Sequence, residues 1–335
     1  MAILSVQHLS KRYGYIQALD GLSFDVPGGS VFGILGPNGS GKTTTLGIIS
    51  GVLKPTSGTF RVFDEAPSAE HRKRIGTLLE TPNFYHYLSA VENLKIAAGI
   101  KERGEADIDS VLARTGLLER KHSPFSTFSL GMKQRLAIAS SLLGSPEVLV
   151  LDEPTNGLDP VGIAEIRELI RSLSREGKTI IMASHLLDEV EKVCTHMVLL
   201  KKGKLVTTGK VSEILAQGDV IEVSAAGFPD LAKVLGAYPG VKTVQLAEER
   251  AAGTRPSSGA PPPADLRFEV IFDDKDVSLG KLNAYCFSQG ITLDHLALKR
   301  KSLETRFLEL TQDTKVPGTK IPKAPPEQKQ NPTRK

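Results

Sequence analysis

Residues 31–44 have the sequence VFGILGPNGSGKTT, in which an apolar run is followed at once by a glycine-rich segment ending in Lys-Thr-Thr. The run 31–35 predicts a buried strand, and the segment after it fits the phosphate-binding loop pattern G-x-x-x-x-G-K-[ST]. Glycines let backbone N–H groups turn toward phosphates without a Cβ in the way, and the helix start adds its positive end. Lys42 would supply a point charge and Thr43 a hydroxyl for Mg²⁺. The predicted nucleotide-binding residues are Gly36, Pro37, Asn38, Gly39, Ser40, Gly41, Lys42, Thr43 and Thr44.

Short β-branched runs alternate with amphipathic helical patterns around this loop. That alternation predicts an α/β fold in which helices cover a mostly parallel sheet. A helical subdomain is expected at about residues 89–143. The predicted strands are residues 3–6, 31–35, 75–79, 148–151, 179–182 and 197–200.

The segment VLVLDEP, residues 148–154, is an apolar strand that ends on two carboxylates. Open α/β sheets place their sites beyond the carboxyl ends of the strands. Asp152 could therefore hold Mg²⁺ through its water shell, and Glu153 could polarise a water for in-line attack on the γ-phosphate. The alternative is that the two acids are solvated residues that cap a helix.

The longer stretch FSLGMKQRLAIASSLLGSPEVLVLDEPTNGLDP, residues 128–160, resembles the signature-to-D-loop block of the ABC transporter ATPases. The resemblance covers about residues 1–216 and implies a P-loop ABC-type ATP-binding domain. In that family, two subunits close around two ATP molecules, and the signature motif of one caps the γ-phosphate held by the other. Ser129 and Gly131 match the motif, whereas Leu130 and Met132 replace its usual Gly and Gln.

Three further positions match the family one at a time, and a fourth departs from it. Tyr13 resembles the aromatic residue that stacks on adenine, although a Tyr on a surface strand is the alternative. His185 resembles the switch histidine that hydrogen-bonds the γ-phosphate. Asp159 resembles the D-loop Asp that crosses the dimer interface, although an Asx turn before a proline would use the same residue. Glu80 stands where the family commonly has Gln in the loop that senses Mg²⁺ and the attacking water, and it resembles the branch that exports lantibiotics, bacitracin and other drugs or peptides.

A second region follows, from about residue 219 to residue 311, and is expected to be an accessory or regulatory domain. Its predicted order of strands and helices is βαββαβ, a small α+β, ferredoxin-like arrangement. We expect either its helix-free sheet face or an apolar stripe to pack against the rest of the chain or a second subunit. The predicted elements are residues 220–223, 229–235, 241–246, 267–272, 276–288, 291–298 and 302–310, and the stripe is Leu303, Phe307, Leu308 and Leu310.

Charge and composition limit the other possibilities. The formal charge of +4 comes from the tail, where residues 315–335 hold six basic residues and one acid, so no nucleic-acid partner is expected. Residues 312–335 have the composition of a disordered tail, with weak attraction to an anionic membrane as the alternative function. No stretch approaches the ~20 apolar residues of a membrane span, and the N-terminus lacks a signal-peptide pattern. Cys194 and Cys286 are expected to be reduced thiols.

The sequence thus predicts a subunit that binds and hydrolyses ATP with Mg²⁺ and drives export through a separate transmembrane permease. A second ATP-binding subunit is expected as partner, in a homodimer or alternatively a heterodimer. The predicted location is cytoplasmic, on the inner face of the membrane through the permease. The alternatives are a soluble non-transport ABC ATPase and a regulatory module, but the chain has a single cassette and keeps Glu153, the residue that a degenerate regulator would lose.

Overall fold

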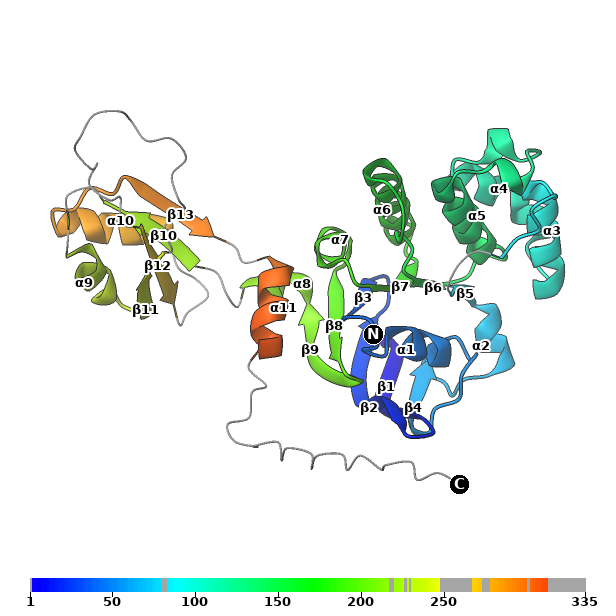
Figure 1. The fold of residues 1–335 in the computed structure, drawn as a ribbon, viewed down its shortest axis with the longest axis horizontal. Helices are drawn as coiled ribbons and strands as arrows, with labels where there is room; N and C mark the ends of the chain where they lie inside the picture. Colours follow the sequence, from blue (N-terminus) through cyan, green and yellow to red (C-terminus); the bar gives the residue numbers. More distant parts are fainter. Residues whose placement is uncertain are drawn as a thin grey trace, which may run out of the picture.

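The computed structural model describes residues 2–79, 83–216, 220–225, 228, 230–247, 267–272, 278–299 and 302–312. Strands β1 to β9 and helices α1 to α8 form one larger body, called the cassette below, and β10 to β13 with α9 and α10 form a smaller one beside it (Figure 1). None of the helices within these ranges has the length and apolar character needed to cross a bilayer.

A six-stranded sheet forms the centre of the cassette. Its strand order is β5-β6-β7-β3-β8-β9, parallel throughout except for the antiparallel pair β8–β9. Every residue of β3, β6 and β7 is buried, as expected for strands with both faces covered. The strands are β3 (Val31–Leu35), β5 (Ile75–Leu78), β6 (Val148–Asp152), β7 (Thr179–Ser184), β8 (His196–Lys201) and β9 (Lys204–Lys210).

An antiparallel sheet of three strands covers one side of the central sheet. It consists of β2 (Ile16–Pro27), β1 (Ala2–Tyr13) and β4 (Ser57–Val62), in that order. Helix α1 (Lys42–Ile49) contributes Leu46 and Ile48 to the apolar core shared by the two sheets. The other side of the central sheet packs against α6 (Pro160–Arg175) and α7 (Leu187–Val193). Helices α2 (Ala69–Lys73) and α8 (Val211–Ala216) complete this part.

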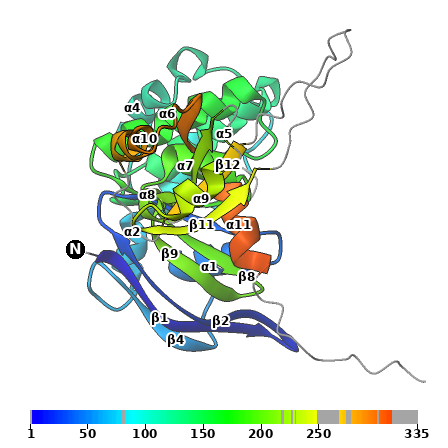
Figure 2. The same cartoon turned by 90° about the vertical axis from the view of Figure 1, so that its left-hand side faces the viewer.

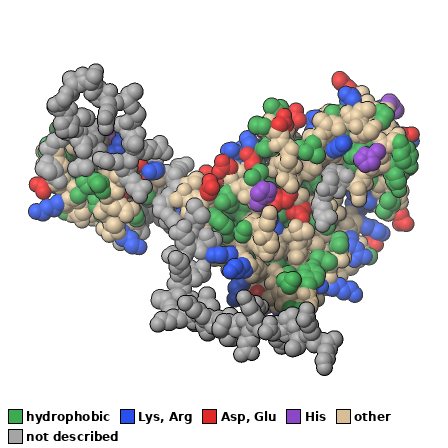
Figure 3. All heavy atoms as spheres, in the orientation of Figure 1, with side chains coloured by type: hydrophobic (Ala, Val, Ile, Leu, Met, Phe, Trp, Pro, Cys, Tyr) green, Lys and Arg blue, Asp and Glu red, His purple; other side chains and the backbone are tan. Residues whose placement is uncertain are grey.

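The predicted helical subdomain contains α3 (Ala90–Lys101), α4 (Ile108–Arg114) and α5 (Leu130–Leu142), with 3₁₀ turns at 105–107, 118–120 and 125–127. Helix α3 begins at a capping box in which Ser89 and Glu92 satisfy each other's backbone N–H groups. Figure 2 shows this subdomain at the end of the cassette opposite β1, β2 and β4. On the face drawn in Figure 3, basic and acidic side chains are interspersed, and apolar side chains gather at the edge formed by α3.

The C-terminal sheet has the predicted βαββαβ order and is antiparallel, with strand order β11-β12-β10-β13. The α/β class with a ferredoxin-like addition is therefore confirmed. The strand predicted at 291–298 begins only at His295, because Ile291 is buried in the small core beside the helices. The elements are β10 (Val220–Ser224), α9 (Leu231–Gly236), β11 (Val241–Leu246), β12 (Arg267–Phe272), α10 (Leu279–Ser288) and β13 (His295–Lys299).

The helix-free face of this sheet is charged rather than apolar. The Lys299 ammonium donates to Glu222 at 2.7 Å and to Glu269 at 3.0 Å. All three side chains project from this face because they alternate with the core residues of their strands. Ion pairs therefore occupy part of this face, and its packing against another surface stays a prediction.

The last helix, α11 (Leu303–Gln312), packs on the cassette instead of on the C-terminal sheet. Leu303 is buried and Phe307 half-buried against the cassette core, which is one of the two predicted arrangements. The side chains of Leu308 and Leu310, also in the predicted stripe, lie outside the described residues, as do Glu80 and the predicted tail.

We predict that Lys101, at the end of α3, makes stability depend on pH in the alkaline range. Burial, aided by nearby Arg103, lowers the pKa of Lys101 to about 8, while its ammonium donates to the Ser140 carbonyl at 2.6 Å. Between that value and the usual lysine pKa near ~10.4, the unfolded chain binds a proton that the folded chain does not. The contribution of Lys101 to the free energy of unfolding should therefore rise with pH from 8 to 10.

The measurement is urea unfolding of wild type and Lys101→Met at pH 7, 8, 9 and 10. The difference in free energy of unfolding, wild type minus variant, should be constant below pH 8 and increase above it. Lys95→Met is the matched control, because Lys95 is exposed on the same helix. A difference that does not change with pH, as expected for the control, would contradict the prediction.

Candidate active site

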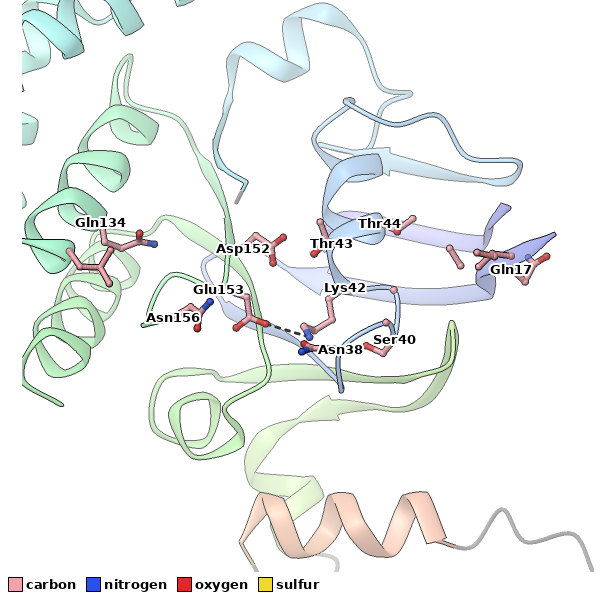
Figure 4. A pocket seen from close by; sticks show the side chains of 15 residues that line it. Gln17, Asn38, Ser40, Lys42, Thr43, Thr44, Gln134, Asp152, Glu153 and Asn156 are labelled. Carbon is pink, nitrogen blue, oxygen red and sulfur yellow. Dashed lines mark ion pairs between the residues drawn. The ribbon is translucent and has the colours of Figure 1, made fainter. Parts of the chain in front are cut away.

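A cleft of about 550 Å³ lies where the central strands end. Its lining brings together most of the predicted loop and both acids that follow β6. Figure 4 shows Gln134 and Asn156 on one side of the cleft, the loop residues on the other, and Glu153 between them. The predicted residues that line it are Asn38, Gly39, Ser40, Gly41, Lys42, Thr43, Thr44, Asp152 and Glu153.

The loop between β3 and α1 requires glycine at specific points. Gly39 and Gly41 have φ of 77° and 105°, in the left-handed region that favours glycine. A Cβ on Gly41 would lie 2.5 Å from the Leu19 side chain, so the loop could not keep this path with a larger residue. Helix α1 starts at Gly41 without a side-chain cap and without an acid in its first turn. Its free N–H groups and positive end therefore remain available to an anion.

Lys42 connects the loop to the acid on β6. Its side chain is 6% exposed, and its ammonium donates to the Gly36 carbonyl at 2.9 Å and lies 3.4 Å from Glu153 Oε1. A buried ammonium is tolerable only when it is paired and hydrogen-bonded. The charge is thus fixed between the phosphate loop and Glu153, as the dashed line in Figure 4 marks.

Glu153 also contacts the predicted switch histidine. Glu153 Oε2 lies 2.7 Å from His185 Nδ1, and its backbone N–H donates to the Ala183 carbonyl at 3.1 Å. The residue has a φ of 47°, a strained conformation for a side chain with a Cβ, of the kind that clusters at functional sites. Asp152 and Ala183 are paired in the register of β6 and β7, so neighbouring strands deliver the acid and the histidine to one point.

The oxygen donors fit a magnesium ion. Asp152 is buried at the end of β6, Thr43 begins the exposed part of α1, and both line the cleft. Mg²⁺ in nucleotide sites is usually held by one or two protein oxygens together with substrate phosphates. Asp152 and Thr43 would hold the ion here; Glu80, the third predicted ligand, lies outside the described residues.

Seven predicted residues that the structure describes do not line this cleft: Tyr13, Gly36, Pro37, Ser129, Gly131, Asp159 and His185. Tyr13 is 44% exposed at the end of β1, although its strand partner Ile16 does line the cleft. Ser129 caps α5 by accepting from the Met132 N–H at 3.3 Å, with Gly131 in the first turn. Asp159 caps α6 by accepting from the Gly162 N–H at 3.0 Å.

Some lining residues were not predicted. Ile16, Gln17 and Ala18 come from the start of β2, a strand that the apolar pattern did not reveal. Gln134 on α5 and Asn156 after Glu153 lie in a segment, residues 128–160, in which only other residues were predicted to belong to the site. Closeness in sequence to predicted site residues could have identified both of them. Gln134 follows Ser129 on the same helix, and Asn156 belongs to the segment that begins with Asp152.

The turn between β8 and β9 holds the phosphate loop in place through backbone hydrogen bonds. The Gly203 N–H donates to the Ser40 carbonyl at 3.0 Å, and the Gly203 carbonyl accepts from the Asp20 N–H at 2.8 Å. A Cβ on Gly203 would lie 2.6 Å from the Ala18 carbonyl. The phosphate loop is therefore fixed by two hairpins as well as by its own strand and helix.

Comparison with known proteins agrees with this geometry. The ABC transporter family model matches residues 19–156. The uncharacterized ABC transporter ATP-binding protein YhcH of Bacillus subtilis is 36% identical over 325 residues, which cover 93% of this chain and 97% of that protein. The bacitracin transport ATP-binding protein BcrA of Bacillus licheniformis is 46% identical over 61% of this chain and 68% of its own length. The lantibiotic transport ATP-binding protein SrtF of Streptococcus pyogenes is 41% identical over 61% of this chain and 89% of its own length.

Solved structures show the same fold. CbiO1 of Clostridium perfringens, part of the ABC transporter complex cbiONQ, superposes with a TM-score of 0.59 at 33% identity, covering 64% of this chain and 91% of that one. The phosphate loop, the paired acids and the histidine thus occur in a chain that resembles ATP-binding subunits along nearly its whole length. The chain therefore belongs to the ABC transporter ATP-binding proteins and is an ATPase of that family.

Proposed function

We propose that this chain uses ATP-driven pairing of two subunits to power export of a drug, peptide or lipid-like substrate through a separate transmembrane permease. The observation that carries the proposal is that Glu153 contacts both Lys42 and His185 at the cleft. Relatives named for bacitracin and lantibiotic transport support the substrate class and the association with a membrane permease. They also favour transport over a soluble or purely regulatory role.

In this proposal Glu153 is the general base. Its carboxylate takes a proton from water while the water oxygen bonds to the γ-phosphorus and the bond to the β-phosphate oxygen breaks, giving ADP and phosphate. Lys42 neutralises phosphate charge from within the loop. Because a carboxylate only accepts, His185 Nδ1 donates in the 2.7 Å contact, and this contact orients the imidazole for its proposed interaction with the γ-phosphate. Mg²⁺ held by Asp152 and Thr43 would stabilise the negative charge of the phosphates.

The second subunit is proposed to complete the site. Ser129 is exposed, caps α5 without an acid in the first turn, and does not line the cleft of its own chain. A helix start with an exposed serine hydroxyl is suited to an anion, so the γ-phosphate of a second copy is its expected ligand. Asp159, exposed at the start of α6, would cross the same interface. The ferredoxin-like domain at about residues 219–311 would regulate or steady this pair.

The first prediction from this proposal separates hydrolysis from binding. Glu153→Gln should lower kcat by ~10² to 10⁴ and retain ATP, because removing a general base leaves the phosphate loop intact. Lys42→Ala should instead lose nucleotide affinity. Steady-state turnover and equilibrium binding of a fluorescent ATP analogue measure the two effects, with Glu105→Gln, an exposed acid of the helical subdomain, as control. Turnover by Glu153→Gln near that of wild type would refute the assignment of the base.

The second prediction tests the shared site by complementation. Ser129→Arg should abolish turnover with little change in ATP affinity, and specific activity of the wild type should rise with protein concentration. In a pair of one Ser129→Arg chain and one Lys42→Ala chain, one of the two sites combines the intact loop of the first with the intact Ser129 of the second. Mixing the two inactive variants should therefore restore hydrolysis. If the mixture stays inactive while both variants still dimerise, each site is complete within one chain.

A further inference from the structure

Helix α11 returns from the C-terminal domain and packs on the cassette next to the active site. Leu303 is only 2% exposed, and it belongs with Phe307 to the same apolar cluster as Leu187 and Val190 of α7. Figure 1 shows α11 beside the strands β8 and β9, away from the four-stranded sheet. The contact is therefore between the end of the chain and the segment that follows the active-site histidine.

Helix α7 has no side-chain cap at its start, although its Val190 packs in the cassette core. It has seven residues, it begins two residues after His185, and its N-cap, Leu186, makes no side-chain capping bond. A helix this short is unstable by itself, so its position depends on tertiary packing. The turn before it is held by one side-chain bond, in which Ser184 Oγ accepts from the Leu186 N–H at 3.0 Å.

Besides the core packing of Val190, charged contacts with α6 and α11 hold α7. On one side, Arg167 of α6 forms a two-pronged ion pair with Glu189, with contacts of 2.8 to 3.1 Å, and Glu189 is 8% exposed. On the other side, the Leu303 N–H donates to Glu191 Oε2 at 3.1 Å, so a carboxylate of α7 caps the start of α11. Leu303 and Phe307 also surround a small void whose other apolar walls are Leu187, Met197, Leu199 and Ile214.

His185 has little support of its own. Its side chain is 40% exposed, and the bonds described for it are those to Glu153, 2.7 Å from Nδ1 and 3.4 Å from its backbone N–H. A displacement of ~1 Å would break the shorter bond, and misplacement on that scale can cost up to ~10² in rate. The backbone position of His185 is set on one side by β7, which ends at Ser184, and on the other by α7, which begins at Leu187.

We propose that Leu303 and Phe307 of α11 are positioning residues for His185, acting through α7. The C-terminal helix thereby makes hydrolysis in the cassette depend on a segment that contributes no atom to the cleft. The effect on turnover rests on the proposed roles of Glu153 and His185, whereas the effect on the position of α7 does not. The proposal predicts an effect mainly on kcat, because the residues of α7 and β8 that α11 contacts do not line the nucleotide cleft.

Amide hydrogen exchange of the full-length chain tests the structural step without reference to activity. Leu303→Ala and Phe307→Ala should accelerate exchange in residues 186–193 and leave exchange in residues 42–49 unchanged. Glu304→Ala is the matched control, because Glu304 is exposed on the same helix. Glu191→Ala should show a weaker form of the effect, and Glu191→Gln should restore protection because its amide oxygen can still accept from Leu303. Unchanged exchange in 186–193 for both apolar variants would overturn the proposal.

Kinetics test the functional step. Leu303→Ala should lower kcat about tenfold and change KM for ATP by no more than about twofold, with Glu304→Ala like wild type. In a His185→Ala background the same substitution should have no further effect on kcat, because the side chain that α7 positions is gone. An equal loss in both backgrounds would mean general destabilisation and would overturn the positioning role. If the wild type itself does not hydrolyse ATP, the proposed function fails, while the exchange experiment still decides whether α11 holds α7.

Discussion

The pairing of the Lys42 ammonium with Glu153 is the interaction on which the site depends. It joins the loop after β3 to the acid after β6, and the strand between them in the sheet, β7, delivers His185 to the same carboxylate. The three strands are parallel and neighbouring, so their carboxyl ends meet at one edge. A buried ammonium without its partner would cost several kcal/mol, on the order of the 3–5 kcal/mol measured for broken buried ion pairs. The charges needed for chemistry therefore also fix the geometry of the sheet edge.

This dependence explains which parts could be predicted. The loop 36–44 and the acids 152 and 153 lie directly after apolar strands, so local patterns were sufficient to locate them. The contact of Glu153 with His185 needed only the rule that parallel strands end at one edge. The bounds of β3, β11 and β12 were also predicted correctly, because β3 is an apolar run and the other two are rich in β-branched or aromatic residues.

The rest depended on tertiary contacts that no local pattern carries. Strand β2 alternates only in its second half, where Leu22, Phe24 and Val26 are buried, and Asp20 with Gly21 interrupts the pattern before residues 16–18. Its residues 16–18 reach the cleft only because its pairing with β1 curves them toward the loop. Gln134 enters the cleft because α5 packs against the sheet. The charged open face of the C-terminal sheet was missed because Glu222, Glu269 and Lys299 come from three separate strands and meet only in the fold.

The turn at Gly203 has a consequence for how the protein meets its nucleotide. The loop backbone is tied at Ser40 to a second hairpin, which is itself tied to Asp20 of a third segment. The cradle is therefore already built before any phosphate arrives, and little conformational entropy has to be lost on binding. Affinity for the triphosphate can then come from the preorganised phosphate loop, while the outer walls of the cleft remain free to change shape during the transport cycle. The phosphate end of the nucleotide is then held by a rigid backbone, and its other end lies against residues that can move.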